Sequence, residues 1–390
     1  MHKKIVNFVK YNKVFLGIYR FFGNAFVAIL SLFVRINKKR ILFMSFGGQK
    51  YDDSPKELFL KIKNDPAFVD YEFIWGFTQP SNFETGCKKV KVDTIRFYIV
   101  ALSSKIWINN SSVERGLKLK RSKTIEINTW HGTPLKKMGK DIPNYKGYKS
   151  KAKKCKGITI YCAQSEYDRD IFARLFNTVK DNIILSDLPR NDVLLQYSEK
   201  QIEEVKTSLN IPLDKKVILY APTFREYDRD KLNSCYIKPP ITISKWKEQL
   251  SNEYVFLLRA HYEVVNVLGV AEDDFVYNVS KYPCLSDLIA ISDLMISDYS
   301  SIYFDYAITE KPMLNFSYDL NEYKTFRGLY LDIENDLPCK LNMLEEDVIE
   351  EIKAMDFEEY IKRSKEFKKR FTPNSGMACE MVINKLKTLI

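Results

Sequence analysis

The chain has 390 residues and a mass of 45.8 kDa, which exceeds what one ordinary hydrophobic core supports, so two domains of similar size are expected. Apolar residues make up 45% of the sequence and charged residues 28%, which excludes a disordered, collagenous or small disulfide-stapled protein. The 61 lysine and arginine residues exceed the 50 aspartate and glutamate residues, giving a net charge of +11. This surplus indicates an anionic partner: nucleic acid, phospholipid or a phosphorylated substrate.

Residues 1–40 carry nine of the basic residues and no aspartate or glutamate. Within them, 21–34 is an uncharged apolar stretch of 14 residues, shorter than the ~20 that a membrane-spanning helix needs. Basic residues close the stretch and no small-residue cleavage site follows, which disfavours a signal peptide. We therefore expect 1–40 to be a basic amphipathic membrane-associating segment. The alternative is that a helix within 14–36 simply packs on its own domain.

The next part of the chain, residues 41–190, alternates apolar runs with amphipathic stretches. The apolar run at 41–48 ends in two glycines, and the following Ser54 and Pro55 are typical of a helix cap and first turn. A helical pattern is also present at 165–176. The other predicted strands of this part are 71–77, 104–110, 124–130 and 157–164.

The same alternation returns in residues 191–342. Its predicted strands are 215–224, 254–261, 273–280, 293–300 and 311–317. Strands that alternate with helices form parallel sheets, so the sequence predicts an α/β fold of two doubly wound, Rossmann-like domains facing a cleft. Residues 343–390 contain an acidic and then a basic amphipathic stretch, which predict terminal helices.

The seven cysteines form no CxxC pair and no even disulfide framework, which predicts reduced thiols in a cytosolic setting and no zinc site. No Walker glycine-lysine loop and no GxGxxG are present, which disfavours a P-loop kinase and a dinucleotide dehydrogenase. The sequence also lacks a hydrolase nucleophile elbow and a histidine-rich metal box. We therefore expect no metal site.

Two of the three histidines, His131 and His261, follow directly after predicted strands, one in each domain. Strand ends are where such folds place their sites, so both are functional candidates, with a structural role as the alternative. The loop that follows His131 suits a general base or phosphate ligand. A third feature is the pair Ser300 and Ser301, at the start of a helix after the strand that ends at Asp298. Two hydroxyls and free amides there predict an anion site, with ordinary capping as the alternative.

The densest basic run has nine lysines between Lys136 and Lys156, starting five residues after His131. A solvated face is the ordinary interpretation of such a run. Because it begins so close to His131, it could instead hold an anionic chain or headgroup near the reaction centre. Lys136, Lys137 and Lys140 are the candidate acceptor or membrane contacts.

Several separate motifs occur in one order along the chain. They are NTWHGTPLKKMG, LPRNDVL, YAPTFR, LLRAHY, ISDYSSIYFDYAI with KPML, and YDLNEYKTFRGLYLD. Together they resemble the CDP-glycerol glycerophosphotransferase family of wall teichoic acid synthesis, over residues 43–381. The resemblance implies a GT-B-like fold, with an acceptor-binding domain at 41–190 and a CDP-donor-binding domain at 191–342.

The resemblance also implies an activity: transfer of polyol phosphate, with glycerol phosphate favoured, from a CDP-activated donor to a hydroxyl of a lipid-linked acceptor, releasing CMP. The implied partners are CDP-glycerol or CDP-ribitol, an undecaprenyl-linked saccharide or teichoic acid acceptor, and an anionic membrane surface, with no nucleic acid. The CDP-polyol is a substrate, and no cofactor is expected. The implied location is peripheral, at the cytoplasmic face of the cell membrane.

By this resemblance, His131 matches the family's proposed catalytic base and His261 a histidine beside the donor pyrophosphate. Ser300 and Ser301 match its donor phosphate-binding pair. Four more residues fall within the motifs and are assigned to the donor side of the cleft: Asp298, Thr223, Arg225 and Arg327. Two departures affect local turns rather than chemistry: Asp187 and Cys339 stand where the family usually has glycine.

The sequence leaves alternatives open. On the same fold, the protein could transfer ribitol phosphate, polymerise a capsule polymer, or transfer a sugar from a nucleotide donor. A non-catalytic basic module on a membrane surface or nucleic acid would explain the charge but not the two strand-end histidines. The choice between glycerol and ribitol depends on a few pocket contacts that motifs do not report. The choice between primase and polymerase is also open, although the compact predicted layout argues mildly for a primase or short-chain transferase.

Overall fold

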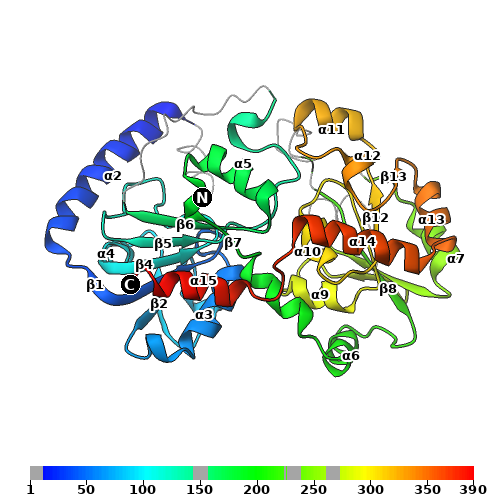
Figure 1. Cartoon of the computed structure of the whole chain (residues 1–390), viewed down its shortest axis with the longest axis horizontal. Helices are drawn as coiled ribbons and strands as arrows, with labels where there is room; N and C mark the ends of the chain where they lie inside the picture. The colour runs from blue at the N-terminus through cyan, green and yellow to red at the C-terminus, as the bar shows by residue number, and fades with distance from the viewer. Residues whose placement is uncertain (1–11, 144–156, 224, 226–238, 261–272) are drawn as a thin grey trace.

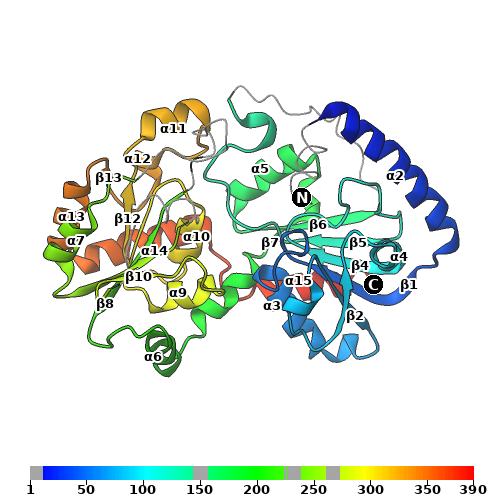
Figure 2. The same cartoon turned by 180° about the vertical axis from the view of Figure 1, so that it is seen from behind.

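The computed structural model describes residues 12–143, 157–223, 225, 239–260 and 273–390. It has two α/β domains side by side, each built around one parallel sheet (Figure 1). The view from behind shows the same two domains in contact near α3 and α15 (Figure 2). The predicted α/β architecture of two parallel-sheet domains is confirmed.

The N-terminal sheet has the order β3-β2-β1-β4-β5-β6-β7, and each neighbouring pair is parallel. Its strands are β1 (Asn37–Met44), β2 (Glu72–Phe77), β3 (Lys88–Lys91), β4 (Ser104–Asn109), β5 (Ile125–Asn128), β6 (Ile158–Ala163) and β7 (Ile183–Leu185). The α-helices between them are α3 (Asp53–Lys63), α4 (Ile95–Ser103) and α5 (Glu166–Phe176). In β5 all four residues are buried, as expected for a strand covered on both faces.

The C-terminal sheet has the order β10-β9-β8-β11-β12-β13, again all parallel. Its strands are β8 (Lys216–Ala221), β9 (Tyr254–Leu258), β10 (Val276–Asn278), β11 (Leu294–Ser297), β12 (Met313–Phe316) and β13 (Leu341–Asn342). Its helices are α6 (Glu199–Ser208), α7 (Ile243–Leu250), α9 (Leu285–Ile291), α10 (Ile302–Ala307), α11 (Leu320–Phe326), α12 (Ile333–Asp336), α13 (Glu345–Lys353) and α14 (Phe357–Phe371). A 3-10 segment, η6 (Pro189–Leu195), leads from the first domain into the second.

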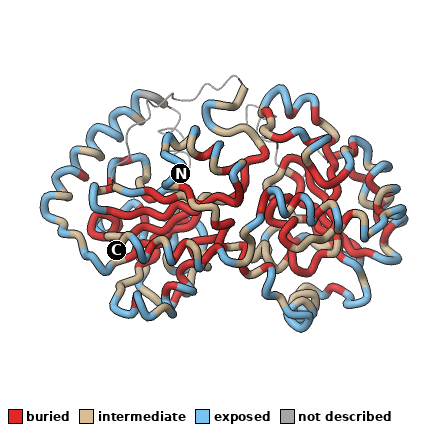
Figure 3. The backbone as a smooth tube through the Cα atoms, viewed as in Figure 1, coloured by how far each residue is buried: buried red, intermediate tan, exposed pale blue. Residues whose placement is uncertain are grey.

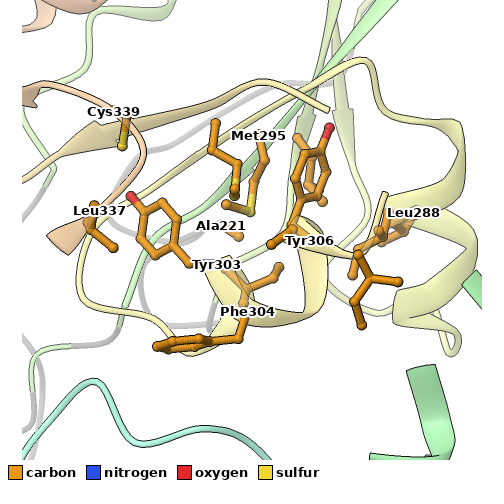
Figure 4. Packing of buried hydrophobic residues seen from close by; sticks show 14 of the residues in the cluster. Ala221, Leu288, Met295, Tyr303, Phe304, Tyr306, Leu337 and Cys339 are labelled. Atoms are coloured by element: carbon orange, nitrogen blue, oxygen red, sulfur yellow. The ribbon is translucent and has the colours of Figure 1, made fainter. Parts of the chain in front are cut away.

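Buried residues concentrate in the two sheets and the helices packed on them (Figure 3). In the C-terminal core, Tyr303 and Tyr306 of α10 pack beside Met295 of β11 (Figure 4). The Tyr303 hydroxyl lies 2.8 Å from the Ser297 carbonyl oxygen and 3.0 Å from that of Leu314. The core therefore fixes α10, and with it the two serines that precede the helix, against the end of β11.

The terminal helices divide between the two domains. Helices α13 and α14 pack on the C-terminal domain, whereas α15 (Ala378–Lys387) crosses back to the N-terminal domain (Figure 1). Val382 and Leu386 of α15 belong to the same buried cluster as Phe43 and Phe59. The predicted segment 343–390 is thus helical, but its last helix completes the core of the first domain.

Helix α2 (Lys13–Phe33) lies along the outer surface of the N-terminal domain (Figures 1 and 3). One side contacts the domain: the Tyr19 hydroxyl donates to the Arg115 carbonyl at 3.0 Å, and Val27 is buried. The other side leaves large apolar side chains in solvent, with Phe22 67% and Leu32 80% exposed.

The length of this helix corrects the expectation drawn from the apolar stretch alone. Val14–Phe33 spans 20 residues with a mean hydropathy of 1.6, so by length and composition the helix is long and apolar enough to cross a membrane. A signal sequence near the N-terminus can have the same length and composition. The 14-residue count was too short because it stopped at Arg20, a single charge that the helix runs past.

Candidate active site

The cleft between the domains is lined by residues that directly follow strand ends. It has a volume of about 590 Å³, and its walls include Phe46 after β1, His131 after β5, Pro222 after β8, Arg259 after β9, and Ser300 and Ser301 after β11. The carboxyl edges of both sheets therefore meet at one cavity, where open α/β sheets bind their ligands. The predicted cleft between two facing domains is confirmed, because residues of both domains line it.

His131 is held in one tautomer by its neighbours. Asn109 pairs with Asn128 across β4 and β5, so the segments that leave these two strands run next to each other. The His131 Nδ1 lies 2.7 Å from the Asn110 carbonyl oxygen, which can only accept, so Nδ1 carries the hydrogen. Nε2 consequently keeps its lone pair.

The imidazole ring stacks on Trp130, with ring centroids 4.1 Å apart. Burial lowers the pKa of His131, although the hydrogen bond to Asn110 and the charge of Asp53 act in the opposite direction. The neutral form is therefore the main form near pH 7. A neutral, oriented imidazole with a free lone pair can serve as a general base.

The loop after His131 touches the donor side of the cleft through Gly132. Gly132 has φ +149°, and a Cβ there would lie 2.8 Å from Ser301 Oγ and 3.1 Å from Ser301 Cβ. Only glycine lets the two loops approach this closely. The structure thus brings His131 and Ser301, predicted from separate motifs, to the same point of the cleft.

The serine pair precedes a short helix. Ser300 Oγ accepts a hydrogen bond from the Ile302 amide at 3.3 Å, while Ser301 occupies the N-cap position without a side-chain capping bond. Both serines line the cleft. Ser300 fits the capping alternative in part, whereas the Ser301 hydroxyl makes no capping bond.

Asp298, Thr223 and Arg225 form a hydrogen-bonded network next to the cleft-lining residues Pro222 and Ser300. The Arg225 side chain is 1% exposed and pairs with Asp298 at 2.7 Å and Asp319 at 2.6 Å. The Asp298 carboxylate also accepts the Thr223 amide at 2.9 Å. Burial opposes the charge of Arg225, but Asp298 and Asp319 raise its pKa well above the usual range. These groups hold the loops after β8 and β11 together, and their assignment to donor binding stays a prediction.

His261 lies outside the described residues. Strand β9 ends at Leu258, and Arg259, the next residue, lines the cleft. Its guanidinium donates to the Tyr282 carbonyl at 2.9 Å and the Val279 carbonyl at 3.2 Å. The described part of the motif therefore leads toward the cleft, and the role of His261 stays a prediction.

The predicted acceptor lysines lie in a segment that pairs with the C-terminal domain. Lys136 forms an antiparallel bridge with Leu329, and the Lys137 amide donates to the Gly328 carbonyl at 3.0 Å. Lys140 Nζ donates to the Arg174 carbonyl at 3.3 Å. Arg327 immediately precedes the paired segment. None of these four residues is among the described cleft-lining residues, so their contact with substrate stays a prediction.

Arg190, in η6, joins the two walls of the cleft, although the sequence motifs predicted no role for it. It pairs with Asp53 of α3 at 2.7 Å and with Asp305 of α10 at 2.7 Å. It also donates to the His131 carbonyl oxygen at 3.1 Å. Arg190 and Asp305 stand inside quoted motifs, but no local pattern pairs residues 115 positions apart.

Among the described residues, no group of three or more histidine, cysteine, aspartate or glutamate side chains is placed to hold a metal ion. The five cysteines in the described ranges, Cys87, Cys162, Cys284, Cys339 and Cys379, are free thiols.

The profile of the CDP-Glycerol:Poly(glycerophosphate) glycerophosphotransferase family matches residues 26–387. The chain belongs to this family. It is 33% identical over 354 residues to the teichoic acid glycerol-phosphate transferase of Staphylococcus aureus, covering 86% of this chain and 89% of that protein. It is also 31% identical to the teichoic acid poly(glycerol phosphate) polymerase of Bacillus subtilis, covering 90% of this chain and 48% of the relative. It likewise spans 46% of the corresponding polymerase of Staphylococcus epidermidis, so it has about half the length of these polymerases.

Solved structures agree with the family assignment. The wall teichoic acid polymerase TagF superimposes with a TM-score of 0.81 and 28% identity, covering 93% of this chain and 92% of that chain. A TagF variant soaked with CDPG gives a TM-score of 0.79 and 29% identity, covering 90% of this chain and 89% of that one. A UDP-N-acetylglucosamine 2-epimerase from Listeria monocytogenes shares only the fold, with a TM-score of 0.53 at 12% identity. The GT-B-like fold is confirmed.

One departure from the family pattern has a local explanation. Asp187, where the family usually has glycine, has φ +67°, a left-handed conformation that favours glycine. Its side chain accepts hydrogen bonds from the Leu188 amide at 2.6 Å and Gln164 Nε2 at 2.7 Å. Burial raises its pKa to about 7, while these hydrogen bonds act to lower it. The polar contacts offset the backbone strain at this turn.

Proposed function

We propose that the protein transfers polyol phosphate, with glycerol phosphate favoured, from a CDP-activated donor to a hydroxyl of a lipid-linked acceptor. The observation that carries the proposal is the single cleft that His131, with Nε2 available, lines from one domain and Ser300 and Ser301 line from the other. Membership of the family and the likeness to a TagF variant soaked with CDPG support this donor class. Relatives named for ribitol phosphate keep CDP-ribitol as the second candidate donor.

The proposed reaction is a direct displacement at phosphorus. His131 Nε2 takes the proton from the acceptor hydroxyl as that oxygen attacks the β-phosphorus of the CDP-polyol. The new bond is a phosphodiester to the acceptor, and the bond that breaks joins the β-phosphorus to the bridging oxygen, so CMP leaves with the electron pair. No covalent enzyme intermediate is needed, and the CDP-polyol is a substrate rather than a cofactor.

The donor side of the cleft stabilises the negative charge that develops on the leaving CMP. The Ser301 hydroxyl and the start of α10 face the phosphates, and His261 is proposed to act beside them. Asp298, Thr223 and Arg225 act by fixing the two loops that carry Pro222 and Ser300. The Lys137 amide pairs with the Gly328 carbonyl of the other domain, and from this segment the lysines are proposed to contact the acceptor and Arg327 the donor.

We also propose that α2 attaches the enzyme peripherally to the cytoplasmic face of an anionic membrane. The helix packs on the domain through Tyr19 and Val27 while its opposite side exposes Phe22 and Leu32, so it can lie in the interface with the domain above it. Binding to phosphatidylglycerol vesicles should fall in Leu32→Gln. The control is Val179→Gln, which changes another exposed apolar side chain, in the loop between α5 and β7. Equal binding by both variants would overturn this attachment.

The activity is tested by incubating the protein with CDP-glycerol or CDP-ribitol and a lipid-linked disaccharide, with or without one glycerol phosphate already attached. CMP release and product mass are measured, and His131→Ala protein with an unchanged melting temperature is the blank. Release with one donor supports the proposal and names the polyol, and the number of added units separates primase from polymerase. No release with any combination, from folded protein, overturns it in favour of a sugar donor.

A further inference from the structure

Three charged side chains from distant parts of the chain meet at the boundary between the domains. Arg190 donates through Nη1 to Asp53 and through Nη2 to Asp305, each at 2.7 Å. Asp53 begins α3 in the N-terminal domain, and Asp305 lies in α10 of the C-terminal domain. The planar guanidinium thus uses two of its nitrogens to span the domain boundary, which a lysine ammonium cannot match in geometry.

This triad is buried, which separates it from an ordinary surface ion pair. The side chains of Arg190, Asp53 and Asp305 are 14%, 5% and 4% exposed. Removing one partner of such a buried group leaves an uncompensated charge, so the three residues depend on one another. Burial opposes the charge of Arg190, but Asp305 and Asp53 raise its pKa well above the usual range, so it stays a cation.

The two carboxylates are themselves held in place. Asp53 has φ +65°, an uncommon conformation for a residue with a side chain, and its Oδ1 accepts the Ser54 amide at 2.7 Å. Asp305 Oδ1 accepts from Asn191 Nδ2 at 3.0 Å, which leaves Oδ2 for Arg190. Each carboxylate therefore presents one oxygen to the same guanidinium.

The same guanidinium reaches the backbone of the candidate base. Arg190 Nη1 donates to the His131 carbonyl oxygen at 3.1 Å, next to the glycine whose loop contacts Ser301. Asp305 follows Ser301 by four residues in the segment that carries the serine pair. Arg190 is thus connected to the base on one wall of the cleft and to the phosphate-facing segment on the other.

We propose that Arg190 is a positioning residue that joins the two domains and sets the His131 loop against Ser301 for transfer. The inference rests on the proposed function, because it assigns the bridge to the geometry of that reaction. Arg190 lines the cleft and acts through the His131 backbone and through Asp305. The arrangement predicts a loss of turnover when the bridge is weakened, even where the charge is kept.

The first test replaces Arg190 with lysine, which keeps the charge but cannot reach Asp53, Asp305 and His131 together. Turnover is expected to fall by about 10- to 100-fold, because a displacement of about 1 Å in a reacting group costs up to roughly 10². The KM for donor and the melting temperature should change little. The control is Arg370→Gln, which breaks an exposed ion pair of the same 2.7 Å length with Asp336, away from the cleft.

The second test follows His131 directly and needs no turnover. The chain has only three histidines, so their ring signals can be followed by NMR during a pH titration, with His131 assigned from a His131→Gln sample. Asp53 and Arg190 are the charged groups that act on this imidazole, the first raising and the second lowering its pKa. Asp53→Asn should lower the pKa of His131, and Arg190→Gln should raise it. If Arg190→Gln fails to fold, the pKa of His131 can still be measured in Asp53→Asn and the turnover in Arg190→Lys.

The outcomes separate the two proposals. Wild-type turnover and an unshifted His131 titration in Arg190→Lys and Asp53→Asn would overturn the positioning role. Turnover and melting temperature can instead fall together while the pKa of His131 stays unchanged. That result would also overturn the positioning role, because it indicates a purely structural bridge. If wild-type protein releases no CMP from any donor, the proposed function fails, while the NMR titration still measures the link from Arg190 and Asp53 to His131.

Discussion

Replacing His131 by alanine removes the candidate base while leaving the opposite wall of the cleft intact. Loss of a general base lowers turnover by roughly 10²–10⁴-fold. That range corresponds to about 2.7–5.4 kcal/mol of activation free energy. Donor affinity should stay within about threefold, because His131 follows β5 of the N-terminal domain whereas Ser300 and Ser301 follow β11.

The pH dependence of the wild-type enzyme follows from the same residue. Burial lowers the pKa of His131 below its ordinary value of 6.5, so the base is neutral and active above that pKa. The acid limb of kcat/KM should therefore have its midpoint below 6.5 and should be absent from the residual activity of His131→Ala. The stability that this neutral imidazole contributes is present above pH 6.5 and is lost as the pH falls through the lowered pKa.

The matched variant is Ser301→Ala, which removes a hydroxyl from the donor side. A hydrogen bond to a charged group contributes about 1.5–3 kcal/mol, so affinity for CDP-glycerol should fall by roughly 10- to 150-fold. Calorimetric titration with the donor, beside steady-state CMP release, separates the two effects. An equal loss of donor affinity in His131→Ala and Ser301→Ala would refute the division of roles between the two walls.

Three further changes test the parts that support the site. Gly132→Ala places a Cβ 2.8 Å from Ser301 Oγ, so kcat/KM for CMP release should fall by roughly tenfold or more, and an unchanged value would contradict the close approach. Leu386→Ala removes a fully buried side chain and should lower the free energy of unfolding in urea by about 2–5 kcal/mol. Arg225→Met leaves the buried Asp298 without its cation and should cost about 3–5 kcal/mol in the same assay, whereas a surface pair would cost under about 1 kcal/mol.

The central strands were predicted from sequence because their apolar runs and the turns after them are local signals. Strands β5 and β11 fall within the predicted runs, and His131 and Ser300 follow them as expected. The strands that were missed, β3, β7 and β13, lie at sheet edges and have only four, three and two residues. Such short edges carry too few apolar positions to form a pattern.

The site was only partly predictable, because its connections are long-range. The sequence proposed His131 and the serine pair by their places after strands, and the structure places all three on one cleft. Arg190, in contrast, pairs with Asp53 and Asp305 over 137 and 115 residues. Charge counting likewise gave no sign that the backbones of Lys136 and Lys137 pair with Leu329 and Gly328. Their contact with the acceptor stays a prediction. A lysine-rich segment indicates charge, whereas backbone pairing depends on the fold.

The return of α15 to the N-terminal domain has a consequence for how the protein is made. Val382 and Leu386 cover apolar residues such as Phe43 and Phe59, yet the ribosome makes them only after the whole C-terminal domain. The N-terminal domain emerges first, and the apolar surface that α15 covers stays exposed to solvent until about two hundred further residues have been synthesised, at ~5–20 per second. Chaperone dependence should consequently concentrate on the N-terminal half of the nascent chain.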